Sequence, residues 1–133
     1  QDIDTIMAKL EDLKQRQTSI FVVDTLEFLY KNGRIGGAKN LFGSILEIKP
    51  ILGLENGAIA ALESQRTQKR AVARMMQLVS EQYPSDGNGY LTLTHAGVPH
   101  RAQKIASELK DLLHFSFFHK KSKKYLVLTF EFV

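Results

Sequence analysis

The chain has 133 residues, of which 44% are hydrophobic, and carries a formal net charge of +4 at pH 7. This length suits one domain with its own core, and the sequence has neither an apolar run of about 18 residues nor a signal-like start, so it predicts no membrane span and no export. Cysteine is absent, which excludes disulfides, thiol catalysis and cysteine-based zinc sites and fits the cytoplasm. Because the chain begins at Gln1, we expect a fragment of a longer protein.

The first third of the chain predicts a helix, a strand and a second helix. Apolar residues recur at helical spacing over residues 2–17, which predicts an amphipathic helix that needs a surface to cover. A short β-branched and aromatic run at residues 20–23 predicts a strand. Asp24 stands three residues before Glu27, a spacing that can satisfy the free N–H groups of a new helix, and Gly33 suits the cap at its end.

A further buried helix and a hairpin are expected next. The helix is indicated by apolar positions at Ala38, Leu41, Phe42, Ile45 and Leu46. Residues 48–52 read as a strand in which Pro50 favours a sheet edge or a bulge. Asn56 and Gly57 both accept positive φ, so a hairpin is predicted over residues 50–63.

The second half of the chain continues the alternation of helices and strands. Thr67 can cap a helix whose apolar face is Ala71, Val72, Met75, Met76 and Val79. Residues 90–94 predict a strand, Pro99 starts a helix, and residues 125–133 alternate as in a last strand. Together these elements predict a mixed α/β (α+β) fold of two layers, with helices on one face of a mixed sheet.

Motifs for catalysis are missing from the sequence. The glycines around Arg34 match neither a dinucleotide-binding loop nor a P-loop, and they are explained by a helix cap and a tight turn. The four histidines have no metal-ligand spacing, and no hydrolase triad is suggested near Thr25 or Ser44. We therefore expect a protein that is not an enzyme and holds no cofactor or metal.

Three segments carry a resemblance to a known family. They are VDTLEFLYKNGRI at residues 23–35, GSILEIKPIL at 43–52 and RTQKRA at 66–71. Over residues 21–113 the chain resembles the C-terminal domain of the DegV family, which comprises bacterial fatty-acid-binding proteins. The resemblance assigns residues 1–113 to this domain, with a leading helix at 1–19, and leaves 114–133 as an atypical tail that offers a closing strand.

The resemblance implies non-catalytic binding of a long-chain fatty acid, whose carboxylate is presented to a partner kinase. In this chain the implied lipid-pocket residues are Leu41, Phe42, Ile45, Leu46, Met75 and Met76, and the implied contacts to the headgroup or the partner are Arg34, Arg66, Arg70 and His95. The family's Gly-Ala-His-Thr-Gly-Pro-Gly motif has no counterpart after Leu113, and the first domain is missing. A carboxylate without partners is costly to bury, so we expect impaired binding by this chain alone.

Two other kinds of function stay open. An uncovered apolar face can drive self-association into a homodimer that holds no ligand. Arg66, Lys69, Arg70 and Arg74 are spaced to form a basic ridge on one helix, which suits an acidic protein surface. Nucleic acid is a less favoured partner, because no aromatic stacking platform is interleaved with these arginines.

Overall fold

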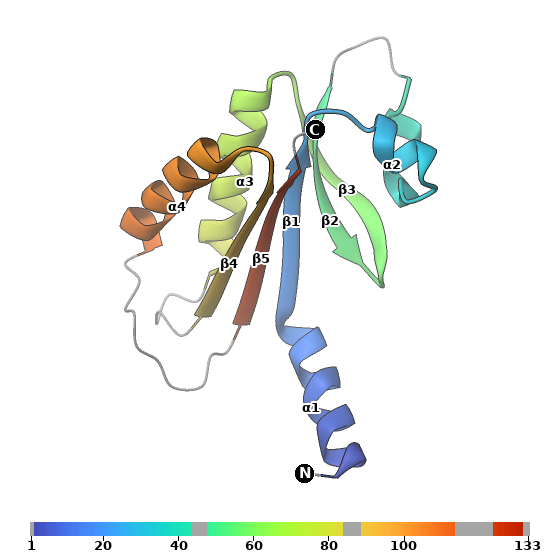
Figure 1. The fold of residues 1–133 in the computed structure, drawn as a ribbon, viewed down its shortest axis with the longest axis vertical. Coiled ribbons are helices and arrows are strands. Elements are labelled where there is room, and N and C mark those ends of the chain that lie inside the picture. The colour runs from blue at the N-terminus through green and yellow to red at the C-terminus, as the bar shows by residue number, and fades with distance from the viewer. Residues whose placement is uncertain (1, 44–47, 84–88, 114–123, 132–133) are drawn as a thin grey trace.

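The computed structural model describes residues 2–43, 48–83, 89–113 and 124–131. Within these residues, five strands form one sheet with the order β3-β2-β1-β5-β4 (Figure 1). The strands are β1 (Gln17–Val23), β2 (Lys49–Glu55), β3 (Ala58–Gln65), β4 (Gly89–Ala96) and β5 (Lys124–Glu131). β1, β5 and β4 run parallel, whereas β2 is antiparallel to both of its neighbours. The predicted mixed α/β class is confirmed.

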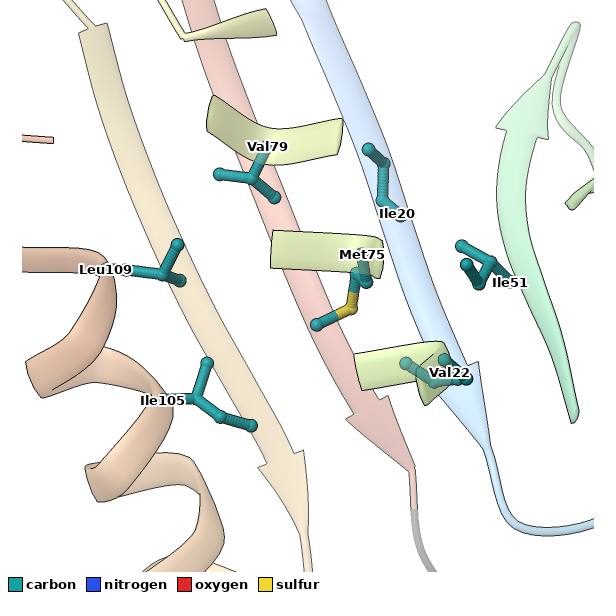
Figure 2. Close-up of a cluster of buried hydrophobic side chains, with 8 residues drawn as sticks. Ile20, Val22, Ile51, Met75, Val79, Ile105 and Leu109 are labelled. Atoms are coloured by element: carbon teal, nitrogen blue, oxygen red, sulfur yellow. The ribbon is translucent and has the colours of Figure 1, made fainter. Parts of the chain in front are cut away.

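Two long helices, α3 (Gln68–Gln82) and α4 (Pro99–Leu113), cover one face of the sheet (Figure 1). Their apolar stripes meet the inward side chains of the strands, and Figure 2 shows Met75 and Val79 of α3 lying over Ile20 and Ile51. The first core cluster formed in this way consists of Ile20, Val22, Ile51, Ala71, Met75, Val79, Ile105 and Leu109. Burial of these side chains is the main contribution to the stability of the domain.

The sequence predicted helices on one face of the sheet, whereas two short helices also lie on the opposite face. They are α2 (Glu27–Lys31) and the 3-10 helix η1 (Gly36–Leu41). In Figure 1 α2 stands on the other side of the sheet from α3 and α4. A second core cluster joins them to the sheet through Phe21, Val23, Leu26, Ile35, Ala38 and Leu52. Alternating residues of β1 therefore contribute to both clusters, as the pleat of a strand requires.

The two helices on this face differ from the sequence prediction. Asp24 does not cap α2; instead Thr25 Oγ1 accepts the N–H of Glu27 at 3.1 Å. The helix starts late because Leu26 is drawn into the second cluster, where only 8% of its surface stays exposed. The helix expected at 38–46 is limited to the 3-10 turns of η1, since Gly43 has a φ of 80° that no helix allows. Ile45 and Leu46 lie outside the described residues.

Turn and cap predictions based on local chemistry are confirmed. Asn56 and Gly57 have φ values of 50° and 78° and close the hairpin between β2 and β3. Thr67 Oγ1 accepts the N–H of Arg70 at 3.2 Å, which caps α3. Pro50 lies on an inner strand, so the sheet-edge reading is wrong, but the alternative of a bulge is confirmed by the register shift after Ile51. The last predicted strand is β5, which lies between β1 and β4.

The leading helix α1 (Ile3–Arg16) is set apart from the rest. It continues directly into β1 and projects beyond the end of the sheet (Figure 1). Its N-cap is Asp2, which accepts the N–H of Thr5 at 2.8 Å. None of its residues is buried, so the surface that its apolar stripe was expected to cover is not found among the described residues.

Candidate functional site

An exposed aromatic surface stands over the second face of the sheet. Tyr30 of α2 and Phe42, which ends η1, stack with their ring centroids 4.2 Å apart and their planes 8° from parallel. Both rings remain open to solvent, with 47% and 37% of their surfaces exposed. Tyrosine is enriched at interfaces, and contiguous exposed apolar area marks binding sites in a way that single exposed residues do not. We call this pair the aromatic surface.

Arg34 is fixed beside the aromatic surface by the end of α2. The N–H of Arg34 donates to the carbonyl of Leu29 at 2.8 Å, and the N–H of Gly33 donates to the carbonyl of Tyr30 at 3.0 Å. With Gly33 at a φ of 65°, this pair of bonds is the Schellman motif that closes a helix. The side chain of Arg34 is exposed. Local sequence chemistry therefore places the backbone of an exposed arginine at the end of the helix that carries Tyr30.

Gly36 holds η1 against the hairpin. Its φ is 51°, and a Cβ added at this position would lie 2.5 Å from the carbonyl oxygen of Ile59 and 3.1 Å from its nitrogen. The close approach lets Ala38 pack with no exposed surface in the second cluster. Because Ala38 is anchored, the following residues Leu41 and Phe42 have defined positions. Glycine is needed here for both its backbone conformation and its lack of a side chain.

The lipid-pocket residues implied by the sequence lie on both faces of the sheet. Leu41 packs half-buried against the second cluster, and Phe42 belongs to the aromatic surface. Met75 is fully buried in the first cluster, and Met76 packs half-buried against it. The sheet separates the two pairs. Within the described residues these four side chains line no common cavity, so their role as a pocket stays a prediction.

The four residues implied in headgroup or partner contacts are all exposed but are not brought together. Arg66 follows β3 and His95 lies in β4, the two edge strands of the sheet. Four strand spacings separate these edges, which amounts to about 19 Å. Arg70 is in the first turn of α3, while Arg34 is beside the aromatic surface. One carboxylate cannot contact both Arg66 and His95.

The basic ridge expected on α3 is shorter than the sequence indicates. Arg74 is engaged in acid pairs: its Nε donates to Glu63 Oε2 at 2.9 Å, its Nη2 to Glu63 Oε1 at 2.8 Å and its Nη1 to Glu81 Oε1 at 3.0 Å. The two hydrogen bonds from Arg74 hold the pKa of Glu63 below its ordinary value. The residues left for a basic ridge are Arg66, Lys69 and Arg70, which are exposed. We use the name basic ridge for these three.

A groove between α3 and α4 was not anticipated from the sequence. It has a volume of about 630 Å³ and is lined by Gln68, Lys69, Val72, Ala73, Met76, His100, Arg101, Lys104, Ile105 and Glu108. Its floor is apolar and its rim is mainly basic. The buried amide of Gln68 has no hydrogen-bond partner among the described residues. The signal that could have revealed the groove is the basic face of α4, which begins next to the N-terminal turn of α3.

Two further properties of the described residues concern membranes and metals. No helix among them has both the length and the apolar character needed to cross a lipid bilayer. No group of three or more His, Asp or Glu side chains in this part of the chain is arranged to hold a metal ion.

Comparison with known proteins identifies the family. The DegV family model matches residues 1–126. The chain belongs to the DegV family. The sequence resemblance over residues 21–113 is thereby confirmed. A DegV domain-containing protein of Halalkalibacterium halodurans is 39% identical over 109 residues, and protein DegV of Bacillus subtilis is 35% identical over 104 residues.

Solved structures give the same assignment for the fold. The crystal structure of DegV from Bacillus subtilis, described as a fatty acid binding protein, superposes with a TM-score of 0.70 and 29% identity. A DegV family protein from Thermus thermophilus, described for its fatty acid binding, gives a TM-score of 0.63 and 26% identity. Both comparisons cover 97% of this chain but only 43% and 44% of those proteins. The chain likewise spans 38% of the Halalkalibacterium relative and 37% of the curated Bacillus subtilis protein.

Proposed function

We propose that this chain is part of a non-catalytic fatty-acid carrier of the DegV family. The observation that supports the proposal is the match of 97% of the chain to the two DegV structures described as fatty acid binding, at 26% and 29% identity. The sequence adds no nucleophile with a base and no nucleotide loop that would suggest chemistry on a substrate. The protein would hold a long-chain fatty acid and leave it chemically unchanged.

The aromatic surface is the part of this chain that we assign to the lipid. Tyr30, Phe42 and the half-buried Leu41 offer apolar area, and each methylene that they remove from water contributes about 0.8 kcal/mol. A carboxylate needs a charged or hydrogen-bonding partner once it leaves water. Lys31, Arg34 and Lys39 are the exposed cations between the two rings in sequence, and Lys31 is paired with Glu27. We assign the carboxylate to Arg34, because a guanidinium can hold a carboxylate through two parallel N–H groups.

The isolated chain should bind fatty acid weakly. Ligand pockets bury most of the surface of a small molecule, whereas Tyr30 and Phe42 are about half and one third exposed. The polar residues implied for the headgroup are spread over different elements of this chain. Additional surface, from outside these 133 residues, would have to enclose the ligand.

Presentation of the carboxylate to a kinase is the second part of the proposal. The basic ridge of Arg66, Lys69 and Arg70 lies at the start of α3 and adjoins the groove through Lys69. Such a surface favours an acidic protein partner by electrostatic steering. Catalysis would belong to the partner, and a cytoplasmic setting fits a chain without cysteine.

Calorimetric titration of the 133-residue chain with a long-chain fatty acid tests the lipid assignment. Binding weaker than micromolar is expected, with a further drop in Arg34→Gln and Phe42→Ala. Arg101→Gln removes a cation from the α3–α4 groove instead and serves as the matched control. Submicromolar binding that Arg34→Gln leaves unchanged would contradict the assignment, and turnover of the fatty acid by the chain alone would contradict a non-catalytic carrier.

The docking assignment needs a separate measurement. Arg66→Glu with Arg70→Glu should slow phosphorylation of the bound fatty acid by a fatty-acid kinase, more at low salt than at high salt. Fatty-acid binding by the same variant should stay unchanged. Equal phosphorylation rates for the variant and the unsubstituted protein at low salt would exclude the basic ridge as the docking surface.

A further inference from the structure

The groove between α3 and α4 combines positive charge with apolar surface. Its basic lining residues are Lys69, His100, Arg101 and Lys104, and the described lining contains a single acid, Glu108. The carboxylate of Glu108 lies 3.9 Å from Lys104 Nζ, and both side chains are exposed, so this acid offsets little of the positive charge. The groove therefore attracts an anion.

The charge is concentrated at one end of the groove because α3 and α4 run in the same direction. β3 and β4, the strands that precede them, are both parallel to β1, and each helix packs back over the sheet (Figure 1). The first turns of the two helices, with Lys69, His100 and Arg101, thus lie at the same edge of the sheet. Helix N-termini carry partial positive charge, and Val98 has no polar side chain with which to cap α4.

Beyond the charged end, the floor of the groove is apolar. It is formed by Val72, Ala73 and Met76 of α3 and by Ile105 of α4. From Gln68 to Met76 the helix rises by about 12 Å. The volume of about 630 Å³ lies within the range of about 300–1,000 Å³ that is typical of small-molecule pockets. These dimensions suit a small molecule with an anionic head and a short apolar body.

Gln68 gives a second, independent indication of a ligand. It is the first residue of α3 and lines the charged end of the groove. Its Oε1 and Nε2 atoms are both buried, and neither has a hydrogen-bond partner among the residues that the structure describes. A buried amide without partners costs free energy. A bound anion could accept a hydrogen bond from Nε2 and so reduce this cost.

We propose that the α3–α4 groove binds an organic phosphate, with the phosphate at the first turns of both helices and the apolar body along the floor. A phosphate monoester has close to two negative charges at neutral pH and three acceptor oxygens, so it can meet the amide of Gln68 and cations from both walls at once. Helix N-termini are favourable sites for phosphate. The groove and the aromatic surface lie on opposite faces of the sheet, so this site is independent of the fatty-acid assignment.

Calorimetric titration of the 133-residue chain with three probes tests the ligand class. Octyl phosphate has both the head and the apolar body, inorganic phosphate lacks the body, and octanoate has a carboxylate head. Octyl phosphate should bind about tenfold more tightly than either of the others. Equal affinity for inorganic phosphate or octanoate overturns the proposal. So does a failure of octyl phosphate to bind at millimolar concentration, including the case in which an acidic amphipathic peptide binds the groove instead.

Substitution of single lysines tests the location. Lys69→Gln and Lys104→Gln each remove a cation from one wall and should each weaken octyl phosphate binding about tenfold, because a charge-assisted contact is lost. Lys110→Gln removes the same charge from the last turn of α4, outside the groove, and should leave the dissociation constant within about twofold. Unchanged affinity in both groove variants would place the ligand elsewhere and overturn the proposal.

Gln68→Leu separates binding from folding. Leucine is of similar size but has no amide, so the free chain no longer buries unpaired polar atoms at this position and should melt no lower than the unsubstituted chain. Octyl phosphate binding should weaken about threefold or more, since the Nε2 donor is lost. An affinity that stays unchanged in Gln68→Leu, whatever the melting temperature, overturns the proposed site.

Discussion

The two faces of the sheet are covered to very different extents. On the first face, α3 and α4 have 15 residues each and bury Ile20, Ile51 and Met75 completely. On the second face, α2 has 5 residues and η1 has 6, and the rings of Tyr30 and Phe42 stay in contact with solvent. Both faces contain a buried core cluster, but the short helices of the second face also leave two aromatic rings exposed.

This difference separates stability from binding. Apolar area that is removed from water on folding stabilises the domain, whereas apolar area that stays exposed remains available to a ligand. The exposed Arg34 ends the helix that carries Tyr30, so the second face has both exposed hydrocarbon and an exposed cation. Substitutions on the first face should thus act on folding, and those on the second face on binding.

Met75→Ala should have the largest effect on stability. Met75 is fully buried between α3 and the sheet (Figure 2), and truncation of such a side chain costs about 2–5 kcal/mol because a cavity remains. Urea unfolding followed by circular dichroism measures the loss. Met76→Ala is the matched control, because the same truncation at a half-buried neighbour should cost clearly less. Equal losses for the two variants would show that the first face is not packed as described.

Gly36→Ala should have the next largest effect on stability, because Gly36 packs η1 against the β2–β3 hairpin on the second face. Both Gly36 and Gly33 have positive φ, so alanine at either position costs about 1–2 kcal/mol. Only at position 36 does the new Cβ meet backbone, 2.5 Å from the carbonyl oxygen of Ile59, while position 33 faces open space. Gly36→Ala should therefore lower the free energy of unfolding more than Gly33→Ala in the same urea assay. The reverse order would contradict the seating of η1 on the hairpin.

Local chemistry was sufficient to predict much of this fold. The hairpin at Asn56 and Gly57 and the cap at Thr67 depend on residues that are adjacent in the sequence, and both were predicted. The late start of α2 depends on burial of Leu26 in a cluster assembled from distant strands. The position of η1 depends in turn on the close approach of Gly36 to β3. Contacts between residues far apart in the chain were therefore the part that periodicity could not supply.

In the candidate site, too, features set by adjacent residues could be predicted, and features set by distant contacts could not. Arg34 could be singled out because a helix-ending glycine precedes it, and the structure places it by that motif. The stacking of Tyr30 on Phe42 could not be foreseen, since the two rings are twelve positions apart and meet only when η1 packs on the hairpin. The pairing of Arg74 with Glu63 was missed for the same reason, because it joins α3 to β3. A row of charges on one helix does not reveal its partners on another element.

Phe42→Ala should change stability only slightly while it reduces lipid binding, which separates the two faces most directly. A stacked aromatic pair contributes about 0.5–1.5 kcal/mol beyond its buried area, and Phe42 is 37% exposed. A double-mutant cycle with Tyr30→Ala, followed by urea unfolding, isolates this coupling. The sum of the losses in the two single variants should exceed the loss in the double variant. Strict additivity would mean that the rings do not interact in solution.

Glu63→Gln should have the smallest effect, and the effect should depend on pH. Arg74 holds the pKa of Glu63 below its ordinary value of about 4.5 through two hydrogen bonds. A carboxylate whose pKa is lower in the folded state stabilises the fold above its ordinary pKa, and this contribution is lost as the pH falls through the lower, folded value. The unsubstituted chain should thus exceed Glu63→Gln in melting temperature at pH 7, and the difference should vanish in acid. Glu81→Gln, which removes one hydrogen bond from a more exposed carboxylate, should show a weaker change. A difference for Glu63→Gln that stays constant from neutral to acid pH would mean that its cause is packing rather than charge.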